Sequence, residues 1–266
     1  MNNIQRKFKS FLNTRSTKCI PLVTNNFGDV NFLFDSPIEL VNKNNIFSVS
    51  LSDMIIPISW YMISDYFNNN KIDLTMNNID YILTIPDGSY TSIELKSILI
   101  TIFPGTFSIS YTSYKNIFTF TNSTYDFTLT NILCYQELGF YNNTSYNSTN
   151  KILSSIKPIN LLGSRKIYIY TNFNTKNCNN GKTSSTILDH IIIDCNNYDV
   201  LRYVNITNFS TYINENSIIE IHIKLYDDEE NLINISSHWS MSIEFCEIKL
   251  DLNNYDINDY KPNIEI

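Results

Sequence analysis

The sequence predicts a mainly β protein, a single jelly-roll β-sandwich that carries a small inserted α+β subdomain. The first observation is composition, since 18 Tyr and 16 Phe occur among many Ile and Thr, side chains that suit a pleated, half-buried surface. The second is that 266 residues with 43% hydrophobic residues contain no Pro-rich, Gly/Ser-rich or highly charged linker, which favours one compact body. The third is that about eight strand candidates lie outside a middle block, the number that a jelly roll needs.

The two ends of the chain differ in charge. The last residues contain mostly acids among their charged side chains, whereas the first 28 contain no acid and five cations: Arg6, Lys7, Lys9, Arg15 and Lys18. We therefore expect a basic N-terminal arm at 1–28 and an acidic C-terminal tail at 253–266. The arm is interpreted either as a solvated tail or as a contact with nucleic acid or an acidic neighbouring subunit. The net charge of −7 argues against a surface that coats nucleic acid throughout.

The first β block follows the arm and contains the clearest strand. Phe47, Val49 and Leu51 alternate with serines at 48, 50 and 52, which is the period of a strand with one buried face. Pro57 ends this strand, and an Asn-rich loop at 68–70 closes the block. We assign 29–77 to the first part of the jelly roll.

The middle block breaks the β pattern with one short helix. Ile85-Pro86-Asp87-Gly88 has the residues of a type I turn, and Thr91 with Glu94 forms a T-x-x-E capping box at a helix start. Phe103-Pro104-Gly105 ends the helix, and three short strands begin near 107, 117 and 126. We assign 78–145 to an inserted subdomain with one helix on a short antiparallel sheet. The apolar stripe of the helix comprises Leu95, Ile98, Leu99 and Ile102.

The third block returns to β character and completes the jelly roll at 146–252. Strand-like runs begin at 166, 190, 217, 232 and 239. In the run from 217, Ile219, Ile221 and Ile223 alternate with polar residues, which predicts that these three share one buried face. A charged turn at 227–231 follows this run.

No combination of reactive side chains indicates catalysis. The histidines, His190, His222 and His238, have no second His, Cys or carboxylate at a metal-ligand spacing. The acidic run 227–230 lacks the residue order of a calcium loop, and the G-K-T string at 181–183 lacks the first glycine of a phosphate loop. Cys178 has no recognisable His and Asn or Asp signature. We therefore expect no enzyme, no catalytic or metal site and no cofactor.

Signals for a compartment are few. The five cysteines are odd in number, widely spaced and without a C-x-x-C pair, which favours reduced thiols in a cytosol-like compartment. No apolar run is long enough to span a bilayer, and no signal-peptide pattern is visible at the start. The N-x-S/T sequons are expected by chance in a chain so rich in Asn, and they do not show secretion.

Three short motifs occur in a characteristic order between about 36 and 245. The first is Ile56-Pro57 followed by Tyr61 and Ile63, and the last is Leu138-Gly139-Phe140. Between them lies the turn-and-helix motif of Ile85, Pro86, Gly88, Tyr90 and Thr91. In this order the motifs resemble the penton-type minor capsid proteins of virophages, Polinton-like viruses and related large DNA viruses. The closing turn at 227–231 departs from the family's pattern because it has no glycine, which puts the exact subfamily in question.

The resemblance implies a viral structural protein and a particular assembly. A jelly roll would form homopentamers at the vertices of an icosahedral double-stranded DNA virus particle and would contact the major capsid protein. The chain would be assembled in the host cytoplasm and located in the virion. The five basic residues of the arm would face the capsid interior, where genome DNA or internal capsid proteins are the expected partners.

Two other interpretations remain open at this point. The first is a β-sandwich adhesin or fibre module that binds glycans through surface aromatics such as Trp60, Tyr61 and Trp239. Trp239 belongs to an alternating strand pattern, however, which favours core packing for this side chain. The second is a cement or minor protein on the inner face of a capsid, with the same fold at a different location.

Overall fold

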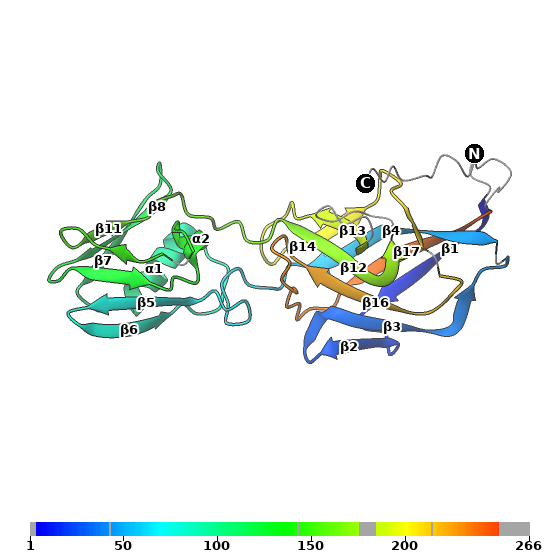
Figure 1. Ribbon diagram of the computed structural model, residues 1–266, viewed down its shortest axis with the longest axis horizontal. Coiled ribbons are helices and arrows are strands. Elements are labelled where there is room, and N and C mark those ends of the chain that lie inside the picture. Colours follow the sequence, from blue (N-terminus) through cyan, green and yellow to red (C-terminus); the bar gives the residue numbers. More distant parts are fainter. Residues whose placement is uncertain (1–3, 43, 143, 176–184, 214, 250–266) are drawn as a thin grey trace, which may run out of the picture. The chain divides into compact units, whose positions relative to one another are not determined.

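The computed structural model describes residues 4–249 except 43, 143, 176–184 and 214 (Figure 1). The expected acidic tail at 253–266 lies outside these residues. The chain divides into two compact units. The first comprises Met1–Ser59 with Lys166–Ile266, and the second comprises Trp60–Arg165. The second unit is therefore an insertion between two parts of the first.

In the described residues of the first unit, every regular element is an antiparallel strand. In chain order they are β1 (Ile4–Asn13), β2 (Cys19–Val23), β3 (Asn26–Glu39), β4 (Asn45–Pro57), β12 (Lys166–Thr175), β13 (Ser185–Ile192), β14 (Val200–Val204), β15 (Thr211–Ile213), β16 (Ser217–Tyr226) and β17 (Ser240–Lys249). One set of neighbours runs β1-β17-β4, with β14 and β15 both on the far edge of β4. The other runs β2-β3-β16-β12-β13. Among the residues that the structure describes, one pair, Thr175 with Ile213, connects the two sets.

This pairing is the strand order of a jelly roll. The strands can be numbered 1 to 8 in chain order if β2, the hairpin partner of β3, is left out and β14 and β15 are counted as one strand. Neighbouring strands of the first set then have the numbers 1-8-3-6. The second set has the order 2-7-4-5. Strands adjacent in sequence thus alternate between the sets, except that β12 and β13 are neighbours in the second set, as in two nested Greek keys. The predicted jelly roll is confirmed, and the insertion lies between its third and fourth strands.

Alternating side chains explain why the two sheets pack together. Phe47, Val49 and Leu51 on β4 are at most 1% exposed, and the serines between them point to the other face. Opposite residues on β17 continue this buried layer, including Phe245 at 0% exposure, whose ring meets Phe47 edge-on at 6.1 Å. Burial of each such side chain contributes about 1.5–3 kcal/mol. The inner faces therefore supply most of the stability of this unit.

The N-terminal segment differs from the predicted arm. Ile4–Asn13 is strand β1, which pairs with β17 from Ile248 to Ser240. The physical reason is that side chains of this segment alternate between the core and solvent, with lysines at exposed positions. Leu12 is buried, and the Phe8 ring stacks on Phe245 with 5.3 Å between ring centroids, while Lys7 and Lys9 point to solvent.

Strand β16 corrects one detail of the predicted alternation. Ile221 and Ile223 are buried, as expected, but Ile219 is 60% exposed and Ile218 takes its place inside. The register with β3 shifts between Ile218 and Glu220. The pairing with β3 is irregular at this point, and the residues of β16 on its two sides do not follow one alternation.

The second unit is an α+β subdomain with two small sheets. Its elements are β5 (Lys71–Met76), β6 (Ile79–Thr84), α1 (Ser92–Ile102), β7 (Phe107–Thr112), β8 (Ile117–Asn122), β9 (Phe127–Thr130), α2 (Tyr135–Leu138), β10 (Tyr146–Asn147) and β11 (Ile152–Ser154). The sheets have the orders β10-β9-β5-β6 and β11-β8-β7. One apolar core, which includes Leu95 and Leu99 of α1, is shared by these elements.

The insertion is longer than the predicted 78–145. Strand β5 lies between β6 and β9 and therefore belongs to it, although the sequence interpretation placed this segment in the jelly roll. Met62 and Ile159 extend the same core at either end, with 8% and 5% exposure. The boundary is set by this shared burial, which local sequence pattern does not reveal.

Helix α1 begins and ends where the sequence predicts. The Thr91 backbone N–H donates to Glu94 Oε2 at 2.9 Å, and the Glu94 N–H donates to Thr91 Oγ1 at 3.3 Å, which is a complete capping box. Leu95 and Leu99 are fully buried, and the helix ends at Ile102 before Phe103 and Pro104. Of the helices described here, none has the length and apolar character to cross a membrane.

Candidate functional site

Two of the three sequence motifs meet in the second unit. Ile63, from the first motif, and Gly88, from the second, form an isolated antiparallel bridge with N–H to O distances of 3.0 and 2.9 Å. The Met62 N–H donates to Ser89 Oγ at 3.1 Å beside this bridge. Residues some 25 positions apart are thereby joined, so the motifs act together to fix where the insertion begins.

Tyr90 explains why the second motif contains glycine. Its hydroxyl donates to the Pro86 carbonyl at 2.6 Å, and its ring lies directly over the turn. A Cβ on Gly88 would lie 2.6 Å from the Tyr90 ring, closer than any normal contact. The I-P-x-G-x-Y pattern is therefore a turn closed by its own tyrosine.

The third motif ends the short helix α2. Gly139 has φ of +73° and follows Leu138 as the helix cap, a conformation that L side chains rarely adopt. A Cβ there would lie 2.2 Å from the Lys157 carbonyl oxygen. Phe140 then enters the core with 0% exposure. All three motifs thus determine the fold of the insertion, and none presents reactive groups.

The three histidines lie apart and each has a structural partner. His222 Nε2 contacts the Asp29 carboxylate, and His238 Nδ1 lies 3.1 Å from Thr14 Oγ1. The His190 ring stacks on Tyr168 with centroids 5.9 Å apart. Within the described parts of the chain, no three His, Cys, Asp or Glu side chains gather as a metal site requires. Cys178 and the G-K-T string lie outside the described residues.

The acidic run after β16 is a self-contained turn. Asp227 is 6% exposed, and its Oδ1 accepts hydrogen bonds from the Glu229 and Asn231 N–H groups at 2.9 and 2.8 Å. Burial raises the pKa of Asp227, and these backbone donors partly offset the shift. The Asp227 carboxylate, which a cation would need as a ligand, thus accepts the backbone hydrogen bonds that close the turn.

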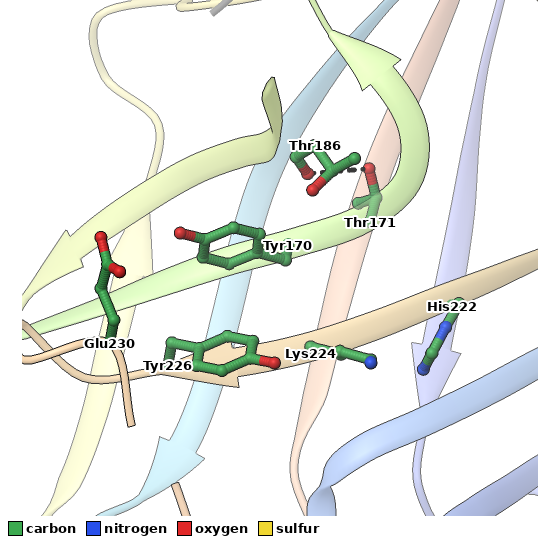
Figure 2. Close-up of a pocket in the computed structure, with 7 residues that line it drawn as sticks. All are labelled: Tyr170, Thr171, Thr186, His222, Lys224, Tyr226 and Glu230. Carbon is green, nitrogen blue, oxygen red and sulfur yellow. Dashed lines mark hydrogen bonds between the residues drawn. The ribbon is translucent and has the colours of Figure 1, made fainter. Parts of the chain in front are cut away.

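The outer face of β12 and β16 carries a shallow polar pocket of about 420 Å³ (Figure 2). The rings of Tyr170 and Tyr226 meet edge to face with centroids 4.9 Å apart, and Lys224 and His222 follow along the same strand as Tyr226. The remaining lining residues are Thr171, Thr186 and Glu230. This face offers hydroxyl, ammonium and carboxylate groups on a rigid sheet, which suits a wet protein contact.

The outer face of β1, β17 and β4 carries a second polar depression, a groove of about 410 Å³. Lys7 and Lys9 of β1 line one side, and Asn205 and Asn208 line the other. Glu244 lies 2.8 Å from the Lys7 ammonium, and the hydrogen bond and charge of Glu244 raise the pKa of Lys7. The floor is formed by the serines at 48, 50 and 52 on β4.

The five cations predicted as a contact arm have different surroundings. Arg6 Nε lies 3.3 Å from Glu247 Oε2, and Glu247 is fully buried, so Arg6 holds β1 in the fold. The carboxylate partners of the lysines are Glu244 for Lys7, Asp53 for Lys9 at 3.9 Å, and Asp35 for Lys18. Arg15 is exposed in the turn after β1. The structure therefore brings Arg6, Lys7 and Lys9 together on one strand and leaves Arg15 and Lys18 in the turn region.

The aromatic residues considered for glycan binding are mostly interior. Trp60 is 5% exposed and Trp239 is 2% exposed, and the Trp239 indole N–H donates to the Phe27 carbonyl at 2.7 Å. Tyr61 is exposed at 41%. A stacking platform for sugars needs an open ring face, so the two tryptophans are excluded from that role.

Comparisons with known proteins add one structural similarity. No family model matches the chain, and no curated protein matches its sequence significantly. Among solved structures, the chain is similar to the crystal structure of the selenomethionine-labelled mavirus penton protein. The match has a TM-score of 0.48 and 10% sequence identity, and it covers 91% of this chain and 100% of the mavirus chain.

Proposed function

We propose that this chain is a structural protein of a virus particle, a penton-type minor capsid protein that forms homopentamers at icosahedral vertices. The observation that carries the proposal is the three-motif order, combined with an insertion between the third and fourth strands of a jelly roll. The motifs have no reactive role but fix the insertion, which is what a shared architecture requires. The particle would contain double-stranded DNA, and the virus would be a virophage, a Polinton-like virus or a related large DNA virus.

The surface of the jelly roll is compatible with ring assembly. Closure around a five-fold axis needs one heterologous contact repeated in each neighbouring pair, and the roll exposes two different sheet faces. Both faces are polar, with Tyr, Ser, Asn and paired charges in the two depressions. Such surfaces suit wet interfaces with bridging water molecules. The major capsid protein is the partner proposed for the outer rim of the ring.

The capsid-interior role of the basic residues stays a prediction. Because β1 and β2 are parts of the sheets, deletion of residues 1–28 would remove two strands and the start of β3 rather than an arm. Arg15 and Lys18 lie outside β1, so the double change Arg15→Gln and Lys18→Gln tests the role without removing a strand. Genome packaging that is unchanged in particles with this double variant would contradict contact between these two cations and DNA.

The oligomeric state of the purified chain tests the proposal. Five copies of the 30.9 kDa chain give a particle of about 155 kDa in mass photometry and a five-fold ring in negative-stain images. A stable monomer or trimer would contradict the penton assignment and favour a cement or fibre role. Labelling of assembled virions with an antibody to the chain would then test the location, with signal expected only at vertices.

A further inference from the structure

The groove on the outer face of β1, β17 and β4 has the properties of a binding site, and we call it the serine groove. Ser48, Ser50 and Ser52 stand two residues apart along its floor, and no hydrogen-bond partner is found for their hydroxyls in the described parts of the chain. Its other lining residues are Ile4, Lys7, Lys9, Val204, Asn205, Asn208, Ser210, Glu244, Cys246 and Ile248.

The groove is rich in donors at the spacing of an extended peptide. Alternate residues of a strand repeat about every 6.6–6.8 Å, and a peptide lying along β4 would repeat at the same distance as Ser48 and Ser50. Ser52 follows at the point where the register of β4 with β17 shifts. Lys7 and Lys9 of β1 line the same groove, with β17 between them and this row. Each ammonium has three donors, so the contacts with Glu244 and Asp53 leave further donors available. An extended segment with carboxylate side chains fits this arrangement.

The chain itself contains such a segment, and it starts at one end of the groove. Strand β17 ends at Lys249, next to Ile248 and Ile4, which line the groove. Residues 251–266 contain four acids, Asp251, Asp256, Asp259 and Glu265, and a single lysine. The segment is thus acidic where the groove presents lysines and hydroxyls.

The direction of β17 favours the groove of another copy over that of the same chain. To enter its own groove the segment would have to reverse, and the first turn-forming residues after β17 are Asn253 and Asn254. A return strand from that turn would be level with Lys249 only at residue 258. Asp251 and Asp256 would then lie beyond the end of the groove. Extended residues 251–259, in contrast, can continue roughly 30 Å beyond the end of β17, away from their own groove.

We propose that residues 251–266 of one copy bind as an extended acidic segment in the serine groove of a neighbouring copy. The exchange would link adjacent copies of the ring through charge and hydrogen bonds. This inference deepens the proposed function and rests on it, because it requires neighbouring copies.

Cys246 lines the groove and allows a direct test in the intact chain. In the variant Asp256→Cys, mild oxidation is expected to produce a disulfide between position 256 of one chain and Cys246 of another, identified by peptide mass spectrometry. Excess synthetic peptide of residues 251–266 should lower the yield. The link must be absent when Cys246→Ser is added. A link within one chain, or no link at Cys246, would overturn the exchange.

Matched charge variants test the electrostatic part. Lys7→Gln with Lys9→Gln should lower the yield of the link about threefold or more, since each exposed ion pair contributes modestly. Lys96→Gln with Lys115→Gln, both in the second unit, should leave the yield unchanged. An equal yield from both double variants would contradict recognition by the groove lysines.

The outcomes separate this inference from the proposed function. A ring of five copies that forms without the link at Cys246 overturns the exchange and leaves the penton assignment standing. A chain that stays monomeric overturns the penton assignment and the exchange together. Binding of the fluorescent peptide 251–266 to that monomer, weakened by Lys7→Gln with Lys9→Gln, would then support the groove as a site for acidic peptides, and an absence of binding would overturn it.

Discussion

At the scale of single residues, one buried carboxylate connects three segments of the jelly roll. Glu247 is 0% exposed, and its Oε1 accepts hydrogen bonds from the Val41 and Asn42 N–H groups and from the Asn45 side chain at 2.7–3.2 Å. Its Oε2 lies 3.3 Å from Arg6 Nε. Glu247 therefore holds β1 and the turn before β4 against β17. A charge buried in this way is stabilised only while its partners remain in place.

We expect Glu247→Gln to destabilise the first unit by about 2–4 kcal/mol, because loss of one charge leaves the remaining hydrogen-bond and ion-pair partners poorly matched in a buried site. Urea unfolding followed by circular dichroism measures the change. Asp35→Asn, which removes an exposed ion pair with Lys18, is the matched control and should change the free energy by less than about 0.5 kcal/mol. Equal effects would contradict the special role of Glu247.

Glycine is required at position 139 for conformational and steric reasons together. Gly139→Ala places a side chain at φ of +73° and brings Cβ to 2.2 Å from the Lys157 carbonyl oxygen. We expect a loss of about 2 kcal/mol or more in the stability of the second unit, measured by urea unfolding. Gly105→Ala is the control, since nothing lies within 4 Å of its new Cβ. A loss from Gly139→Ala no larger than that from Gly105→Ala would show that the turn relaxes freely.

At the scale of elements, helix α1 shows how local chemistry fixes a boundary. Its first turn is held by the capping box of Thr91 and Glu94, and its last turn ends before Pro104. The backbone hydrogen bond from Thr91, with a further bond from the Thr91 hydroxyl, lowers the pKa of Glu94. The stabilising form is therefore the carboxylate, which suits the positive end of the helix dipole.

The lowered pKa of Glu94 gives a pH prediction with a definite sign. Its contribution is present above the unfolded pKa, about 4.3, and is lost as the pH falls through the lower folded value. Glu94→Gln should thus reduce the stability of the second unit at pH 7, and the difference from the parent should shrink on acidification. Urea unfolding at several pH values measures this. Glu215→Gln, in the first unit, should leave the same transition unchanged.

At the scale of the whole molecule, the chain contains two cores that do not share residues. The core of the second unit is built from residues between Met62 and Ile159, including Phe140 at 0% exposure. The core of the first unit is built from both flanking parts of the chain, with Phe47 on β4 and Phe245 on β17 in contact. Each unit therefore has the buried surface that an independent transition needs.

We expect Phe140→Ala and Phe245→Ala to act on different unfolding transitions. Each change should destabilise its own unit by about 3–5 kcal/mol through loss of buried area and cavity formation. The other unit should keep its transition temperature. Hydrogen exchange mass spectrometry resolves the two units, because peptides of 60–165 and of the flanking parts are distinct. A single cooperative loss of protection in both units would contradict independent cores.

Features that local chemistry encodes could be predicted from the amino-acid sequence alone. The buried face of β4, the capping box of α1 and the end of β6 before Pro86 follow from spacing and turn residues, and the structure has each of them. The strand count also predicted a jelly roll, which the strand order confirms. The face of β4, the capping box and the end of β6 depend on residues within about ten positions of one another.

Features that depend on distant partners could not be predicted from local sequence pattern. Strand β1 forms because β17, more than 200 residues later, supplies both its hydrogen bonds and Phe245 against Phe8. Segment β5 belongs to the insertion because β6 and β9 pair with it, and Ile219 is exposed where the pairing of β16 with β3 is irregular. The serine groove likewise combines side chains of β1, β4 and β17. Strand pairing and burial between segments far apart in sequence determine these outcomes, and local periodicity contains no information on which strands become neighbours.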